Sequence, residues 1–128
     1  MFELKVTTDF AAAHQLDLTG RKCENLHGHN WKIEVFATGK KLDKSGVLVD
    51  FGIIKKRLKQ VMNTLDHKFL NELDLFPKNL PPSSENIARY IGLEMEKLLN
   101  KDKIEATISK ITAWESDNAA ASWINSDA

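Results

Sequence analysis

The sequence contains one cysteine, three prolines and no excess of charge of either sign. A single cysteine, Cys23, excludes an internal disulfide framework. Lysine plus arginine and aspartate plus glutamate each number 18, so a broad basic surface for nucleic acid is not expected. No apolar run approaches the roughly 18 residues of a membrane span, and the first residues lack a signal-peptide pattern. We therefore expect a soluble, cytoplasmic protein with no nucleic-acid or membrane partner.

The length of 128 residues is that of one domain, and we expect residues 1–128 to form a single one. Apolar residues alternate with polar residues near both ends of the chain, which predicts strands, and recur at helical spacing in the middle. Asp50 is a candidate cap for the first helix, and Ser83 or Ser84 for the second. In order, the predicted elements are strands over 2–14 and 27–38, helices with apolar stripes over 53–65 and 87–99, and strands over 104–115 and 119–124.

This order, strand, strand, helix, helix, strand, strand, predicts an α+β fold in which two helices cover one face of a four-stranded sheet. The alternation slips near Ser109 to Ile111, which indicates a bulge. The other face and the edges of such a sheet remain exposed, so we expect closure by oligomerisation.

Three of the four histidines fall within sixteen residues, at His14, His27 and His29. In extended strands all three belong to the inward-facing phase. Three neutral imidazoles suit zinc and leave a fourth position for water or substrate, although iron and nickel also accept imidazole. The alternative is that they are ordinary sheet residues satisfied by hydrogen bonds.

Three further positions are candidates for chemistry. Three residues separate Cys23 from His27. Cys23 is a candidate base or nucleophile, a fourth metal ligand, or an inert buried thiol. Asp66 and His67 form an acid–histidine pair suited to proton transfer, or a histidine that complements a helix dipole. Glu115 ends an apolar strand and is either functional or an exposed strand end.

Five motifs together resemble the 6-pyruvoyl-tetrahydropterin synthase family. The Cys-x-x-x-His-Gly-His spacing is the most specific, and is similar to that of the 6-carboxy-5,6,7,8-tetrahydropterin synthases of the queuosine pathway. The motifs, in order, are Phe10 to His14, Cys23 to His29, Leu65-Asp66-His67, Pro82 to Asn86, and Trp114-Glu115.

The resemblance implies a tunnelling fold, in which four-stranded antiparallel sheets form a trimeric barrel and two trimers stack into a hexamer, with active sites at subunit interfaces. It also implies zinc as the cofactor. The implied site residues are the zinc ligands His14, His27 and His29, the catalytic residues Cys23, Asp66 and His67, the pterin-holding Glu115, and the pocket-lining Ser83, Ser84 and Glu85.

The implied reaction is a lyase reaction that converts 7,8-dihydroneopterin triphosphate to 6-carboxy-5,6,7,8-tetrahydropterin, releasing acetaldehyde and triphosphate. Alternatives are a pyruvoyl-forming synthase, a dihydroneopterin-cleaving activity, or a non-catalytic pterin- or metal-binding module. The anionic substrate calls for a basic patch, for which Lys40, Lys41 and Lys44, or the Lys55 to Lys59 group, are candidates.

Overall fold

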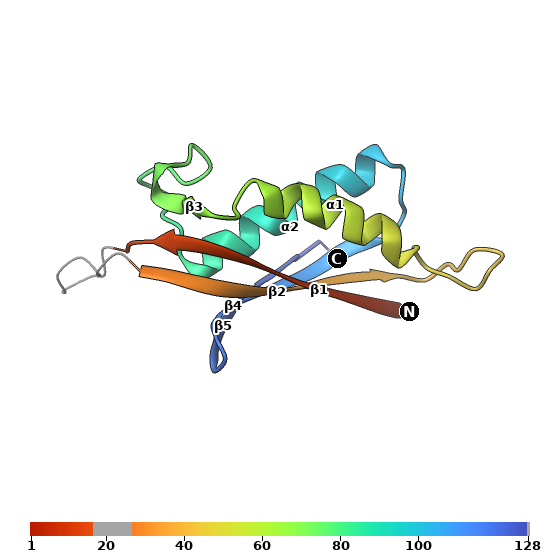
Figure 1. The fold of residues 1–128 in the computed structure, drawn as a ribbon. Coiled ribbons are helices and arrows are strands. Elements are labelled where there is room, and N and C mark those ends of the chain that lie inside the picture. Colours follow the sequence, from red (N-terminus) through yellow and green to blue (C-terminus); the bar gives the residue numbers. More distant parts are fainter. Residues whose placement is uncertain (17–26, 128) are drawn as a thin grey trace.

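The fold is a single sheet with both helices on one face, as a computed structural model of residues 1–16 and 27–127 describes it (Figure 1). The sheet order is β3-β1-β2-β4-β5. The α+β class and the placement of the two helices agree with the sequence-based prediction. The elements are β1 (Phe2–His14), β2 (His27–Gly39), α1 (Phe51–Asn63), β3 (Lys68–Phe69), a 3-10 helix (Leu70–Glu72), α2 (Ser84–Lys101), β4 (Thr107–Ser116) and β5 (Ala119–Ile124).

The sheet has five strands and is mixed, so the expectation of four antiparallel strands is wrong in this detail. The additional strand, β3, is two residues long and pairs in parallel with Ala12 and Ala13 of β1. A two-residue strand is too short to produce an alternating pattern, which is why periodicity did not reveal it.

Strands β1 and β2 form a long antiparallel pair that runs from Phe2 opposite Gly39 to His14 opposite His27. Alternate side chains of this pair face the helices, and those of Val6, Phe10, Trp31 and others are buried there. Phe2 belongs to the same phase but is 47% exposed, because it lies at the outer end of the strand.

Side-chain caps begin both helices. Asp50 Oδ1 accepts a hydrogen bond from the Gly52 N–H at 2.8 Å, and Ser83 Oγ accepts one from the Asn86 N–H at 3.1 Å. Ser83, rather than Ser84, is therefore the cap of α2. The first helix buries Ile54 but leaves Ile53 37% exposed, because consecutive helical residues point about 100° apart.

The predicted bulge in β4 is confirmed. Phe36 pairs with Lys110 and Ala37 with Ile108, so Ser109 is the extra residue. A second irregularity in β4 surrounds Glu115, because Trp114 pairs with Ala120 whereas Ser116 pairs with Ala119.

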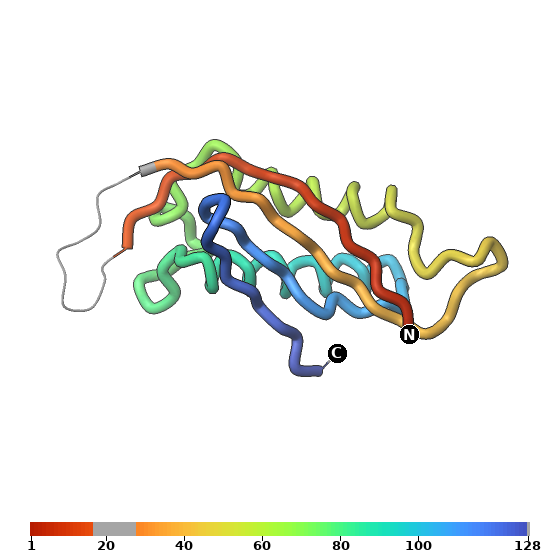
Figure 2. The backbone as a smooth tube through the Cα atoms, turned by 90° about the horizontal axis from the view of Figure 1, so that it is seen from below, coloured from red at the N-terminus to blue at the C-terminus, as the bar shows by residue number. Residues whose placement is uncertain are grey.

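The helices leave one face of the sheet uncovered (Figure 2). Polar side chains on that face contact one another. Glu34 at its centre accepts a hydrogen bond from the Trp114 indole N–H at 2.5 Å and pairs with Lys5 Nζ at 3.4 Å. These interactions, the Trp114 bond foremost, lower the pKa of Glu34. Within the part of the chain described, neither helix has the length and apolar character needed to span a membrane.

Candidate active site

One end of the inner sheet face is polar, where His14, His29 and Glu115 converge. His29 Nε2 lies 2.8 Å from Glu115 Oε1, and His14 Nε2 lies 3.4 Å from the same oxygen. One ligand atom from each of the three residues lies within 4.8 Å of the others. The His14 side chain is fully buried, whereas those of His29 and Glu115 are 20% and 30% exposed. The cluster therefore combines a buried anchor with an open side.

The strand order explains why these residues meet. β2 lies between β1 and β4, and His29 is opposite Ala12 in the ladder, next to the end of β1. Glu115 follows the inward phase of Ile111 and Ala113 on β4 and lies within the second irregularity of that strand. Bulges re-aim side chains beside active sites, and this one occurs where the acid joins the two histidines.

A hydrogen bond fixes the tautomer of His14. Its Nδ1 lies 2.8 Å from the carbonyl oxygen of Pro82, which can only accept, so Nδ1 carries the proton and donates. The neutral ring then carries its lone pair on Nε2, the nitrogen that faces Glu115. A histidine whose second nitrogen donates to a backbone carbonyl is the usual arrangement of a metal-ligating imidazole.

Trp31 separates the polar cluster from the apolar core. Its ring centroid lies 5.1 Å from that of His14 and 5.5 Å from that of His29, edge to face in both cases. The indole is fully buried, and its N–H has no hydrogen-bond partner among residues 1–16 and 28–127.

The donor set fits a transition metal. Two imidazole nitrogens and one carboxylate oxygen are ligand types that zinc, iron and related ions accept. The structure thus brings together two of the three predicted histidine ligands. Backbone pairing sets His27 opposite His14, but the side chain of His27 and all of Cys23 lie outside the described residues. Their roles stay predictions.

Sequence reasoning assigned Glu115 to the substrate and missed it as a candidate metal ligand. The signal was present in the sequence, because Glu115 continues the alternation of Ile111 and Ala113 on the face that carries the histidines. A carboxylate in phase with inward-facing imidazoles at one end of a sheet is a candidate ligand.

Asp66 and His67 lie at the outer edge of β1, just before β3 pairs with it. Asp66 Oδ1 accepts a hydrogen bond from the Ala11 N–H at 2.9 Å, and the His67 N–H donates to the Ala11 carbonyl at 2.6 Å. The two side chains approach to 3.6 Å between Asp66 Oδ2 and His67 Nε2. His67 has a φ of 59° and an 82% exposed side chain, so this left-handed residue presents its imidazole to solvent.

The predicted pocket residues at the start of α2 differ in what they contact. Ser84 Oγ donates to Glu115 Oε2 at 3.3 Å and so adjoins the cluster. The Ser83 hydroxyl oxygen caps the helix, and Glu85 in the first turn is exposed.

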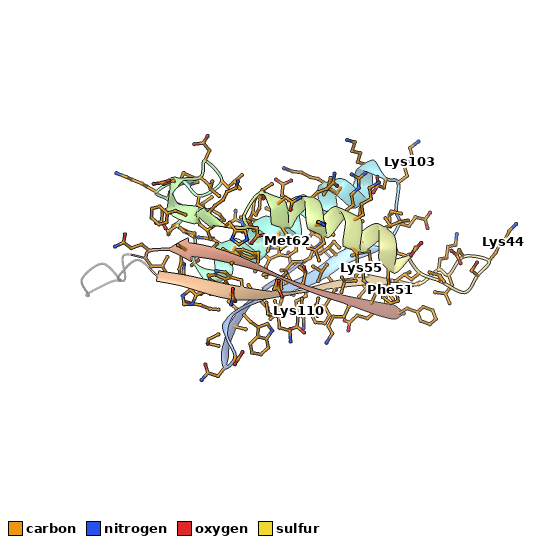
Figure 3. The ribbon with its side chains drawn as sticks, viewed as in Figure 1. Lys44, Phe51, Lys55, Met62, Lys103 and Lys110 are labelled. Atoms are coloured by element: carbon orange, nitrogen blue, oxygen red, sulfur yellow. The ribbon has the colours of Figure 1, made fainter. Side chains whose placement is uncertain are left out.

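The candidate basic residues lie in two different places. Lys44 lies in the connection after β2, at the opposite end of the sheet from β3 (Figure 3). At about 3.3 Å per strand residue, the span from His29 to Gly39 alone is about 33 Å, so Lys40, Lys41 and Lys44 cannot reach the cluster of their own chain. Lys55 and Lys59 instead line a hollow beside β1 together with Asp66.

Fold and site together define a class of small α+β proteins that carry a candidate metal centre at one end of the inner sheet face. Comparison with known families assigns the chain within this class. Residues 3–125 match the family model described as 6-pyruvoyl tetrahydropterin synthase, and the chain belongs to that family of pterin-metabolising enzymes.

Relatives carry several names within this family. A putative 6-carboxy-5,6,7,8-tetrahydropterin synthase of Archaeoglobus fulgidus is 37% identical over 77% of this chain and 81% of its own length. A 6-carboxy-5,6,7,8-tetrahydropterin synthase of Haemophilus influenzae is 30% identical over 90% of this chain and 93% of its own. A dihydroneopterin monophosphate aldolase of Pyrococcus furiosus is 34% identical over 83% and 82%.

Solved structures show the same fold. The 6-pyruvoyl tetrahydropterin synthase of Caenorhabditis elegans superposes with a TM-score of 0.82 over 98% of this chain and 96% of its own, at 24% sequence identity.

Proposed function

We propose that the protein is a zinc-dependent lyase that converts 7,8-dihydroneopterin triphosphate to 6-carboxy-5,6,7,8-tetrahydropterin, with release of acetaldehyde and triphosphate, in queuosine biosynthesis. The convergence of His14, His29 and Glu115 carries this proposal, because it is a candidate metal-ligand set in a member of a pterin-metabolising family. The short Cys23 to His27 spacing and the carboxy-forming relatives support the choice of product.

The metal would be held by His14, His29 and His27. His27 is included because it lies opposite His14 in the ladder. When bound, zinc would supply Lewis-acid polarisation of substrate oxygens, which makes neighbouring protons easier to remove. The role of Glu115 is either to add a carboxylate ligand or to accept hydrogen bonds from the amino-pyrimidine edge of the pterin, for which its two oxygens are suited.

Proton transfer falls to Cys23 and to the Asp66–His67 pair. Cys23 acts as a thiolate base on one side of the substrate, and the His67 imidazole exchanges protons on the other side or with Cys23 itself. Asp66 anchors this histidine, since its two oxygens contact the Ala11 N–H and the His67 ring.

The active site is completed between subunits of a trimer or a dimer of trimers. Among the described residues, the outer side of β1 is bonded only near its end, where Ala11 contacts Asp66 and His67 and where Ala12 and Ala13 pair with β3, and β5 ends the sheet. Unpaired edges of this kind favour joining to another copy, which would close a barrel. The exposed imidazole of His67 at such an edge is suited to serve a neighbouring subunit's site.

Two related reactions compete with this proposal. The relative from Pyrococcus furiosus favours cleavage of a dihydroneopterin phosphate without the carboxy product. A putative 6-pyruvoyl tetrahydrobiopterin synthase of Caenorhabditis elegans, 31% identical over 81% of this chain, favours the pyruvoyl product.

Mass spectrometry of the products decides among these reactions. Purified, zinc-loaded protein is incubated with 7,8-dihydroneopterin triphosphate, and both the pterin and the small carbonyl product are identified. We expect 6-carboxy-tetrahydropterin with stoichiometric acetaldehyde. A pyruvoyl product without acetaldehyde, or glycolaldehyde from aldol cleavage, contradicts the proposal. The Cys23→Ala variant is the control, which should bind metal and assemble normally yet lose turnover.

A further inference from the structure

The two oxygens of the Glu115 carboxylate have different partners. Oε1 lies 2.8 Å from His29 Nε2 and 3.4 Å from His14 Nε2. Oε2 accepts a hydrogen bond from the Ser84 hydroxyl at 3.3 Å. One oxygen therefore faces the histidines while the other is directed to the start of α2.

Local contacts hold the segment that carries Ser84. Ser83 caps α2, and the Asn86 side-chain amide donates to the Pro81 carbonyl at 2.8 Å. Two consecutive prolines fix the backbone just before the cap. Because Ser83 already serves as the cap, the hydroxyl of Ser84 is available to reach across to β4.

The same segment also orients the buried histidine. The Pro82 carbonyl accepts the Nδ1 proton of His14, and Ser84 lies two residues further on. One helix start thus contacts both the His14 ring and the Glu115 carboxylate, which come from β1 and β4. Groups that orient metal ligands in this way typically change metal affinity by about 10–100-fold when they are removed.

We propose that Ser84 is a positioning residue of the metal centre, whose hydroxyl holds Glu115 Oε2 and so keeps Oε1 directed at His14 and His29. This rests on the proposed function, which supplies the metal. It also gives Ser84 a role different from lining the substrate pocket.

Metal binding by the substrate-free protein tests this role. Ser84→Ala removes the hydroxyl, Ser84→Thr retains it, and Ser116→Ala is the matched control, because that hydroxyl adjoins Glu115 in sequence but donates to Asn118 Oδ1. Zinc affinity is measured by competition with a chromophoric chelator, and the Co²⁺-substituted proteins are compared by visible absorption. We expect Ser84→Ala to weaken zinc binding about tenfold and to alter the cobalt spectrum. Ser84→Thr and Ser116→Ala should match the wild type.

Three results overturn the inference. Unchanged zinc affinity and an unchanged cobalt spectrum in Ser84→Ala remove the positioning role while leaving the proposed function intact. An equal loss in Ser84→Thr shows that the hydroxyl is not what matters. A wild-type protein that binds neither metal overturns this inference and the proposed function together.

Discussion

The middle and the end of the inner sheet face are built from the same strands but differ in what their side chains do. The middle is apolar, with Ile33, Val35 and Ile111 fully or almost fully buried beneath the helices. Towards one end of the sheet the same inward phase changes character. Four residues from Ile33 on β2 it carries His29, four residues from Ile111 on β4 it carries Glu115, and His14 lies beside them at the end of β1. The middle stabilises the fold, whereas the end costs desolvation of polar groups, which a function must justify.

Removing a side chain from the middle should have the largest effect on stability. Ile111→Ala deletes fully buried carbon atoms and leaves a cavity, so we expect a loss of about 2–5 kcal/mol in the free energy of unfolding. Denaturant unfolding of the metal-free protein measures it. Ile124→Ala is the control, because Ile124 is 69% exposed on β5 and its truncation should change stability by no more than about 0.5 kcal/mol. Equal losses in both variants would show that the middle is not the core.

At the polar end we expect a substitution to change metal affinity rather than stability. His29→Ala removes a candidate ligand, so zinc affinity should fall by more than the roughly 100-fold upper range seen when only a supporting partner is lost. The metal-free protein should keep its stability to within about 1 kcal/mol, because His29 is partly exposed and contributes little apolar burial. Chelator competition and denaturant unfolding measure the two quantities.

Asn30→Ala, at the exposed neighbouring position, is the control and should leave zinc affinity unchanged. If His29→Ala bound zinc normally, the polar end would be ordinary structure rather than a site.

A smaller effect is expected where β5 packs on α2. A Cβ at Gly92 would lie 2.3 Å from Trp123 Cε3, closer than atoms can approach. Alanine in a helix is worth about 1 kcal/mol over glycine, but overpacking costs about 1–3 kcal/mol, so Gly92→Ala should be destabilising on balance. In a Trp123→Leu background the same change should become stabilising. A double-mutant cycle by thermal or chemical unfolding measures this reversal, and additivity of the two changes would contradict it.

Much of the fold was predictable because its signals are local. Alternation predicts β1, since each inward residue touches the same apolar layer, and the slip at Ser109 is the mark of the observed bulge. The strand β3 was not predictable, because its two residues pair through the turn that Asp66 and His67 make against Ala11. Such a contact depends on the tertiary path of the chain.

The sequence predicts which residues form the site but not the hydrogen bonds that join them. The phase of His14 and His29 follows from sequence, and so does that of Glu115 once the alternation of β4 is extended. The contacts of Ser84 with Glu115 and of Pro82 with His14 join residues 31 and 68 positions apart, and no spacing rule gives them. These contacts set the tautomer of His14 and orient the Glu115 carboxylate, and the proposed chemistry uses both.

The last contrast concerns a half-buried acid nearer the other end of α2, where Glu96 links the helix to the sheet. Its Oε1 accepts hydrogen bonds from the Ile108 N–H at 2.9 Å and from Asn125 Nδ2 at 3.1 Å. Burial raises the pKa of Glu96 above its ordinary value of 4.5, and these two hydrogen bonds only partly oppose that effect. This carboxyl therefore binds its proton more tightly in the folded protein than in the unfolded chain.

The sign of the pH dependence follows from this difference. The contribution of Glu96 to the free energy of unfolding is fully present below its unfolded pKa and is lost as pH rises through the raised folded pKa. Glu96→Gln keeps an oxygen that accepts both hydrogen bonds but does not titrate. The stability of the wild type relative to Glu96→Gln should therefore decline from about pH 4 to neutral pH, a smaller change than the others. Parallel denaturant titrations across this range measure it, and a relative stability that stayed level or rose with pH would contradict the assignment.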